Sequence, residues 1–294
     1  GSAILRKLTK LKYKKIHVKN KKQLDLRNQL AVDRYLKKIK PNAVIIAAAK
    51  VGGINANNKY KADFIYDNLA IQNNLINSSF KAGVKNLIFL GSSCVYPKNS
   101  KQPIKEEYLL SGYLEKTNEP YAIAKIAGIN LCQSYNYQYG LNYKCLMPAN
   151  AYGLNDNYDI NNSHFFPALI KKIVDAIKTK KNYIRIWGNG KPLREVIFAD
   201  DIADACIYFL NKKTSRTVIN IGTGIEKSIT EYANFMMKHL KVNFKIIYEK
   251  KNLNGTPRKL LDCTLAKKYG WKYRTSLEQG LSETINDYLK KNIL

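Results

Sequence analysis

The most constraining feature of this sequence is a regular alternation of short apolar runs with longer helical patterns. Four apolar runs predict strands, at 15–18 (KIHV), 43–49 (AVIIAAA), 86–91 (NLIFLG) and 143–147 (YKCLM). Between them we expect helices at 3–11, 30–39, 61–83 and around Tyr121. Because continuous apolar strands are typical of parallel sheets covered on both faces, the pattern predicts an α/β fold with a doubly wound, Rossmann-like sheet.

The second half of the chain continues as mixed α/β structure, with short strands expected at 183–188, 194–198, 218–222 and 244–248. No repeat or low-complexity linker divides the 294 residues, so we expect a smaller second domain that is interwoven with the first. The first domain is expected to comprise residues 1–150, with returning segments at about 196–225 and 274–290. The second is expected to comprise residues 151–195 and 226–273.

The formal net charge of +28 raises the question of a nucleic-acid partner. The lysines are spread from the first residues to the last, and no RNA- or DNA-binding motif accompanies them. A lysine-rich solvated surface therefore explains the charge better than specific nucleic-acid binding. Weak nonspecific binding at low salt is still expected.

Cysteine and histidine usage indicates neither disulfides nor a metal site. The five cysteines are odd in number and form no Cys-x-x-Cys pair, so we expect reduced thiols in a cytoplasmic protein. The three histidines are too scattered in sequence to suggest zinc. No run of about 18 apolar residues occurs, so we expect no membrane-spanning segment.

Tyr121 and Lys125 are four residues apart in a predicted helix, so their side chains share one face and can converge on a third group. In a chain with 21 tyrosines and 50 lysines and arginines, such a pair also occurs by chance. The pair therefore gains meaning only from longer motifs around it.

Six such motifs occur in order along the chain: AAAKVGGINANN (47–58), FLGSSCVYP (89–97), KTNEPYAIAKIAG (116–128), NNSHFFPALI (161–170), WGNGKPLRE (187–195) and GTPRKLLD (255–262). In these motifs the sequence resembles the GDP-L-fucose synthase family of extended short-chain dehydrogenases/reductases. The resemblance implies a Rossmann domain that binds NADP(H), a smaller sugar-nucleotide domain and a homodimer. It also implies conversion of GDP-4-keto-6-deoxy-D-mannose to GDP-L-fucose, by inversion at C3 and C5 followed by reduction of the C4 ketone.

The resemblance assigns five catalytic residues. For the reduction, Tyr121 would donate a proton to the C4 oxygen and Lys125 would stabilise the tyrosinate and hold the nicotinamide ribose. Ser92 would complete this set, with the neighbouring Ser93 left open as an alternative. For the epimerisations, Cys94 is implied as the base and His164 as the acid, and Cys94 then needs a positive group nearby to lower its pKa.

The cofactor choice can be argued from the segment after the KIHV run, which is Lys19-Asn20-Lys21-Lys22. An acidic residue there favours a ribose 2′-hydroxyl, whereas a basic residue favours the 2′-phosphate of NADP(H). Ordinary surface lysines are the alternative explanation. The resemblance implies further cofactor contacts, from Lys21, Asp25, Leu26, Ala47, Ala48, Ala49, Asn68, Tyr121, Lys125, Pro148, Asn150, Ala151 and His164.

On the substrate side, the resemblance implies Asn150 at the sugar, and Lys172, Trp187, Arg194 and Lys259 around the nucleotide sugar. Arginine suits bidentate diphosphate contacts. Lys172 stands where relatives often have arginine, which weakens the expectation of fork-like phosphate binding. Ala149 and Ala151 also replace the residues usual beside the nicotinamide.

The sequence departs most from the family at its start, where a first strand and glycine-rich turn would hold a pyrophosphate at a helix N-terminus. Gly1 is followed directly by a predicted helix; Gly1-Ser2 is either a tag remnant or the end of such a turn. We expect the gene product to be longer, and this chain to be unstable or to bind NADP(H) poorly, because a central strand contributes something near 10 kcal/mol of burial.

Two alternative functions remain open at this point. One is another extended reductase acting on a nucleotide sugar, such as a 4-epimerase or a 4,6-dehydratase, which needs Tyr121 and Lys125 but not Cys94 with His164. The other is a noncatalytic binding protein that relies on its positive charge. The presence of all five expected catalytic residues argues against a decayed site.

Overall fold

The computed structural model describes residues 1–160, 162–249 and 255–292. Its α-helices are α1 (Ser2–Lys10), α2 (Gln29–Ile39), α3 (Ile54–Lys59), α4 (Lys61–Lys81), α5 (Glu119–Tyr139), α6 (Phe165–Lys178), α7 (Ala199–Asn211), α8 (Ile229–His239), α9 (Thr264–Lys268) and α10 (Leu277–Asn292). Two short 3-10 helices are η1 (Ser93–Val95) and η2 (Glu106–Tyr108). The strands are β1 (Ala43–Ile46), β2 (Asn86–Leu90), β3 (Asn142–Pro148), β4 (Asn150–Tyr152), β5 (Tyr183–Trp187), β6 (Leu193–Phe198), β7 (Val218–Ile221), β8 (Glu226–Ser228), β9 (Lys245–Glu249) and β10 (Arg258–Lys259).

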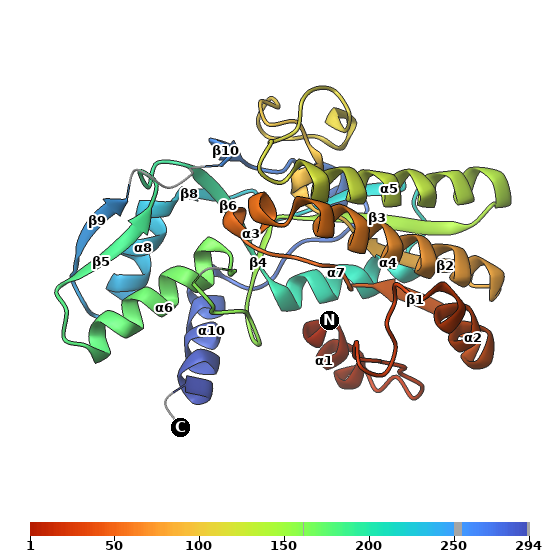
Figure 1. Ribbon diagram of the computed structural model, residues 1–294, viewed down its shortest axis with the longest axis horizontal. Helices are drawn as coiled ribbons and strands as arrows, with labels where there is room; N and C mark the ends of the chain where they lie inside the picture. Colours follow the sequence, from red (N-terminus) through yellow and green to blue (C-terminus); the bar gives the residue numbers. More distant parts are fainter. Residues whose placement is uncertain (161, 250–254, 293–294) are drawn as a thin grey trace.

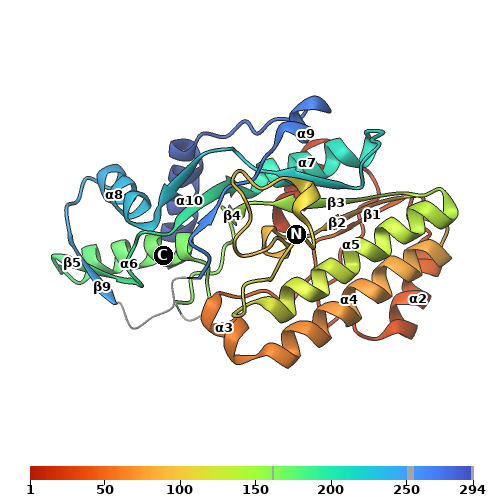
Figure 2. The same cartoon turned by 90° about the horizontal axis from the view of Figure 1, so that it is seen from above.

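The first half of the chain is built around a parallel sheet in the order β1-β2-β3-β7. Ile46 pairs with Phe89, and Phe89 with Cys145, so the strands are aligned at their carboxyl ends. Helices α4 and α5 lie side by side on one face, with α2 beside α4, and α7 lies on the other with α1 packed on it (Figure 2). The predicted α/β class with a doubly wound parallel sheet is confirmed.

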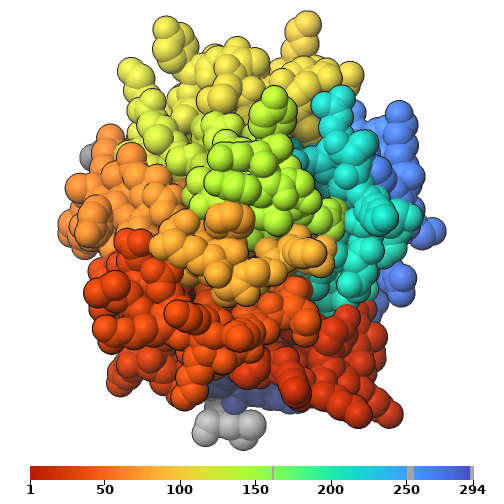
Figure 3. All heavy atoms as spheres, turned by 90° about the vertical axis from the view of Figure 1, so that its right-hand side faces the viewer, coloured from red at the N-terminus to blue at the C-terminus, as the bar shows by residue number. Residues whose placement is uncertain are grey.

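Side chains fill the space between these layers. Phe89, Cys145, Leu146 and Ile219 are completely buried in a first core cluster. Ion pairs from Arg6 to Asp200 and from Lys7 to Asp204 fix α1 to α7. Figure 3 shows one end of the molecule, where the red and orange segments form the lower part of the face and lie against green segments above them and cyan segments beside them.

Side chains of α6, α8 and α10 form a second core cluster together with residues of β5 and β6. These elements lie together at the other end of the molecule (Figure 1). Here β6 pairs in parallel with β4 and β10 and antiparallel with β8, while β5 pairs with β9. Leu281 and Ile285 of α10 pack in this second cluster, whereas Leu261 and Trp271 pack in the first. We expected α10 in the first domain and residues 261–271 in the second, so each segment packs with the core cluster of the other domain. The exact domain boundaries stay a prediction.

Two details of the expected strands are wrong. The KIHV run at 15–18 is not a strand: His17 is exposed, and 60% of the Val18 surface is accessible. In the part of the chain that the structure describes, β1 is an edge strand that pairs with β2, and residues 15–18 pair with no strand. The run at 43–49 forms a strand only as far as Ile46, and residues 47–49 begin a loop. None of the described helices is long and apolar enough to span a bilayer.

The buried carboxylate of Glu195 in β6 joins three separate segments. One of its oxygens accepts hydrogen bonds from the backbone N–H groups of Thr223 (2.5 Å) and Gly224 (2.7 Å), and the other from Leu261 N (2.8 Å). Any side chain at Gly222 would collide with this carboxylate, because a Cβ there would lie 2.2 Å from Glu195 Oε1. Glu195 thus fixes the segment after β10 against β6.

Lys144, in the middle of β3, is a buried cation with little compensation. Its side chain is 1% exposed, and its ammonium donates to Asn142 Oδ1 at 2.7 Å. Burial lowers the pKa of Lys144 from its ordinary value of 10.5 to about 8. The folded protein therefore carries this charge at neutral pH at a cost in stability.

We predict that Lys144→Met stabilises the fold by about 2–3 kcal/mol at pH 7, in line with a lowered lysine pKa. Between about pH 8 and the ordinary lysine pKa the unfolded chain binds more protons than the folded one, so wild-type stability rises with pH and the advantage of Met shrinks. Urea unfolding at pH 7 and pH 10 measures both effects, with the exposed Lys85→Met as control. A destabilised Met variant at pH 7 would contradict the prediction.

Candidate active site

Tyr121 and Lys125 both project from the first turns of α5, as their spacing predicts. The Lys125 ammonium lies 5.9 Å from the centre of the Tyr121 ring and 4.5 Å from that of Phe89. It is buried and donates to the carbonyl oxygen of Leu90 at 2.8 Å, which anchors it at the carboxyl end of β2. Burial lowers the pKa of Lys125 to about 8.

Ser92 follows β2, and its hydroxyl lies close enough to the phenol of Tyr121 to influence its pKa. Burial raises the pKa of Tyr121, the nearby Cys94 adds to the rise, and Ser92 opposes it. Ser93 is instead the first residue of η1 and is buried. Of the two serines left open by the sequence, Ser92 is therefore the one at the Tyr121 hydroxyl.

Cys94 sits at the centre of a group of polar and positive side chains. Its sulfur accepts hydrogen bonds from Asn118 Nδ2 at 3.2 Å and from Lys259 Nζ at 3.5 Å. Burial by itself raises the pKa of Cys94, but Lys259, Ser92 and Arg194 together outweigh it, so the net shift is downward. The positive neighbour that the sequence required is Lys259, which β10 brings from the far end of the chain.

Lys259 also connects Cys94 with His164, the residue that precedes α6. Both desolvation and the charge of Lys259 lower the pKa of His164. Arg194 lies in the same group: burial lowers its pKa to about 10, while Cys94 and Glu115 oppose the change.

Two further expected residues meet on the side of the second core cluster. The Lys172 ammonium lies 5.0 Å from the centre of the Trp187 ring, a cation–π distance, and burial lowers its pKa. Asn150 donates from Nδ2 to the carbonyl oxygen of Glu195 at 2.8 Å, so its amide supports β6 as well.

The loop after β1, which carries Ala47, Ala48 and Ala49, is held by the buried Asn68. Its amide bonds both the N–H and the carbonyl of Lys50, at 2.9 and 3.0 Å. Gly53 closes this loop against the segment before His164: its N–H bonds Asn162 O at 2.9 Å, and a Cβ would lie 2.7 Å from Ser163 O. Asn161, the first residue of the 161–170 motif, lies outside the described residues.

The other residues expected to bind the cofactor lie on several separate segments. Lys21 is exposed, and Asp25 is paired with Arg27, whose guanidinium also reaches Asp67 at 3.1 Å. The carbonyl of Leu26 accepts from Asn74 Nδ2 at 2.9 Å. Pro148 ends β3, and the exposed Ala151 pairs with Ile197 in β4.

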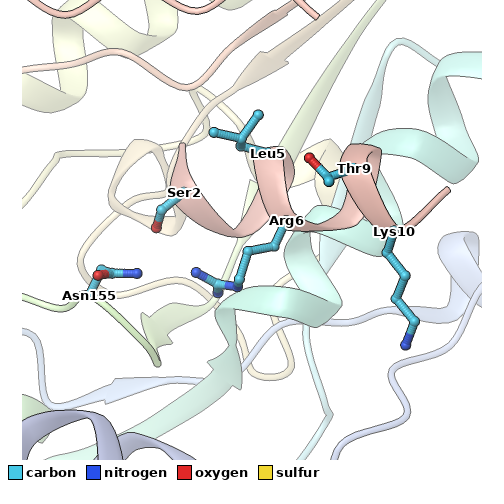
Figure 4. Close-up of a pocket in the computed structure, with 6 residues that line it drawn as sticks. All are labelled: Ser2, Leu5, Arg6, Thr9, Lys10 and Asn155. Carbon is cyan, nitrogen blue, oxygen red and sulfur yellow. The ribbon is translucent and has the colours of Figure 1, made fainter. Parts of the chain in front are cut away.

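The residues around Tyr121 fit the dinucleotide that the motifs imply. The Lys125 ammonium has three N–H groups, and among the described residues only Leu90 O accepts one of them. The remaining N–H groups suit a pair of vicinal ribose hydroxyls. By contrast, an open pocket of about 490 Å³ beside α1 is lined by none of the expected site residues (Figure 4); its lining is Ser2, Leu5, Arg6, Thr9, Lys10 and Asn155.

The sequence did not point to three residues of this site. Asn118 contacts Cys94, Glu115 lies close enough to influence Arg194, and Glu195 holds the segment of Lys259. Asn118 and Glu195 fall inside two of the six motifs, three residues before Tyr121 and one after Arg194, and this proximity in sequence was the available signal.

We predict that Lys259→Met slows alkylation of Cys94 by iodoacetamide about tenfold at pH 7, because a nearby opposite charge favours the reactive thiolate. The pH at which the alkylation rate is half-maximal should rise. The other four cysteines are buried, and Cys94→Ser gives the background. Lys191→Met, at an exposed lysine outside this cluster, should leave the curve unchanged; an unchanged curve for Lys259→Met would refute the role of its charge.

Comparisons with known proteins agree with this geometry. The family model described as "NAD dependent epimerase/dehydratase family" matches residues 1–222. The GDP-L-fucose synthase of Sinorhizobium fredii is 47% identical over 289 residues, covering 98% of this chain and 92% of that protein. The GDP-L-fucose synthase of Escherichia coli is 42% identical, covering 99% of this chain and 93% of that protein.

Solved structures point the same way. A GDP-6-OMe-4-keto-L-xylo-heptose reductase from C. jejuni superposes with a TM-score of 0.91 at 35% identity, covering 99% of this chain and 95% of the other. A GDP-L-fucose synthetase from Naegleria fowleri, bound to NADP, has a TM-score of 0.89 at 27% identity and covers 99% and 91%. The chain belongs to the NAD dependent epimerase/dehydratase family and, within it, to the GDP-L-fucose synthase family.

Proposed function

We propose that this protein converts GDP-4-keto-6-deoxy-D-mannose to GDP-L-fucose with NADPH, by inverting C3 and C5 and reducing the C4 ketone. The observation that carries the proposal is the meeting of two sets of groups at one place. Ser92, Tyr121 and Lys125 form a ketone-reducing set, and Cys94, beside Lys259, directly adjoins it. A 4-epimerase or a 4,6-dehydratase has no use for the second set.

The reduction uses a proton from the Tyr121 hydroxyl. Ser92 hydrogen-bonds the C4 oxygen together with Tyr121, and this polarises the carbonyl. Lys125, next to the phenol, stabilises the tyrosinate that remains after proton transfer. NADPH, when bound, supplies the hydride for C4, and the Lys125 ammonium holds its ribose hydroxyls.

The epimerisations use the same ketone, which acidifies the protons on C3 and C5. The Cys94 thiolate removes a proton from one of these carbons, and the electrons are held as an enolate on the C4 oxygen. His164 then returns a proton to the opposite face of the carbon, and inversion results. The lowered pKa of Cys94 supports its role as base.

The nucleotide end of the substrate is bound on the side of the second core cluster. Arg194 and Lys259 neutralise the diphosphate, and the Lys172–Trp187 pair contacts the nucleotide sugar. Asn150 contributes at the sugar. Lys21, Asp25, Leu26, the 47–49 loop, Pro148 and Ala151 bind the cofactor on the other side.

We further propose that the enzyme is a cytoplasmic homodimer without a specific nucleic-acid partner. Exposed apolar and aromatic side chains on α4 and α5 support a protein interface there, among them Tyr66, Ile123 and Tyr137. The charge of +28 is then a solvated lysine surface.

We predict that Tyr121→Phe lowers the rate of substrate-dependent NADPH oxidation at least 100-fold, because general acid catalysis contributes about 10²–10⁴-fold. NADPH affinity, measured by cofactor fluorescence, should change little. Tyr113→Phe, at a tyrosine that is 96% exposed, is the matched control. Wild-type turnover in Tyr121→Phe would exclude the proposed proton donor.

We predict that Cys94→Ser and His164→Gln still consume NADPH but no longer give GDP-L-fucose. A serine hydroxyl does not ionise at neutral pH and so cannot serve as the base, and a glutamine amide cannot donate a proton as an acid. NMR of the sugar product reports the configuration at C3 and C5. His17→Gln, at an exposed histidine, should behave as wild type. Normal GDP-L-fucose from both site variants would show that residues other than Cys94 and His164 carry out the epimerisations.

A further inference from the structure

Asn118 occupies the N-cap position of α5 but does not cap the helix. Asparagine is favoured at this position because its side-chain oxygen accepts a hydrogen bond from the second or third N–H of the helix. Elsewhere in this chain the expected bond forms: Asn28 caps α2 by accepting from Ala31 N at 3.1 Å, and Ser228 caps α8. The side chain of Asn118 makes no such bond.

The amide of Asn118 is turned toward Cys94 instead. Its Nδ2 donates to the sulfur at 3.2 Å, within the range of a hydrogen bond to sulfur. Its Oδ1 is buried and accepts no hydrogen bond from any residue that the structure describes. The protein thus forgoes a helix cap and leaves a buried acceptor unpaired, and both lower stability. Among the described residues, the hydrogen bond to Cys94 is what the Asn118 side chain gains in return.

That contact has a defined chemical effect. An N–H donor stabilises a thiolate more than a thiol, because only the thiolate carries a full negative charge. The other charged or titratable groups facing Cys94 are Lys259 from β10, Arg194 from β6 and Tyr121 from α5. Lysine and arginine supply charge, but at the end of long, flexible side chains, whereas Asn118 is short and fixed at the start of a helix.

We propose that Asn118 is a positioning residue of the epimerisation site, whose Nδ2 holds the Cys94 side chain in its thiolate form. This inference rests on the proposed function for its role in catalysis, but the contact itself does not. Asn118 lies three residues before Tyr121, so the same helix start that supplies the proton donor for the ketone also orients the base for the neighbouring carbons.

Asn118→Asp separates this role from a purely structural one. Aspartate has nearly the same shape, is an equally good N-cap and interacts favourably with the helix dipole. A structural role therefore predicts unchanged or raised thermal stability and an unchanged thiol. Our proposal predicts that replacing the donor by a carboxylate disfavours the thiolate, so that Cys94 alkylation by iodoacetamide at pH 7 falls more than tenfold without loss of Tm.

Asn118→Ala removes the donor without adding charge, and Asn130→Asp, exposed in the same helix, controls for an added carboxylate. The proposal predicts that Cys94 is alkylated fastest in the wild type, more slowly in Asn118→Ala and slowest in Asn118→Asp. Asn130→Asp should be alkylated as fast as the wild type, and melting curves should show that all variants are folded. Should the Asp variant not fold, the Ala variant alone decides: slower alkylation at unchanged Tm supports the proposal, and wild-type alkylation overturns it.

A second readout links the contact to catalysis. In D2O with GDP-4-keto-6-deoxy-D-mannose and no NADPH, Asn118→Asp should lose deuterium incorporation at C3 and C5 while still binding NADPH. Wild-type incorporation in this variant would overturn the role in epimerisation. Alkylation needs no sugar, so if the wild-type protein fails to act on this substrate, the alkylation order still tests the contact separately from the proposed function.

Discussion

The candidate site depends on the buried carboxylate of Glu195. Burial raises the pKa of Glu195, and hydrogen bonds from the backbone N–H groups of Thr223, Gly224 and Leu261 oppose the rise by stabilising the charged form. These bonds join β6 to the segment that follows β10. As a result Arg194 and Lys259, which are paired in register, lie beside Cys94 although about 65 to 165 residues separate the three in sequence. The positive charge at the site is thus a product of tertiary structure.

Burial and charge act differently on the two sets of catalytic groups. Lys125 is desolvated beside Phe89, so its pKa falls to about 8 and its charge is easily modulated near neutral pH. Cys94 is surrounded by donors and cations, which favour its anion. A phenol with a raised pKa and a thiol with a lowered pKa therefore coexist around a single ketone. Such divergence of environments is how one site supports both acid and base chemistry.

The sequence predicted those features that depend on local pattern. The apolar runs at 86–91 and 143–147 form β2 and β3, and Tyr121 and Lys125 lie on one face of α5, as their i, i+4 spacing predicts. The KIHV run at 15–18 has the composition of a strand, but composition alone does not place a segment beside another strand, and this run pairs with none of the described strands. The packing of Leu261 and Trp271 in the first core cluster, and the rotation of the Asn118 amide away from its helix, depend on residues distant in sequence. No local pattern encodes them.

The central claim is that one ketone-centred site both epimerises and reduces. Incubating the wild-type protein with GDP-4-keto-6-deoxy-D-mannose in D2O without NADPH tests it most directly, since proton exchange then proceeds without reduction. The account predicts deuterium at both C3 and C5 by NMR, and GDP-L-fucose that retains this label once NADPH is added. NADPH oxidation without deuterium at either carbon would contradict it, because the protein would then reduce the ketone without epimerising its neighbours.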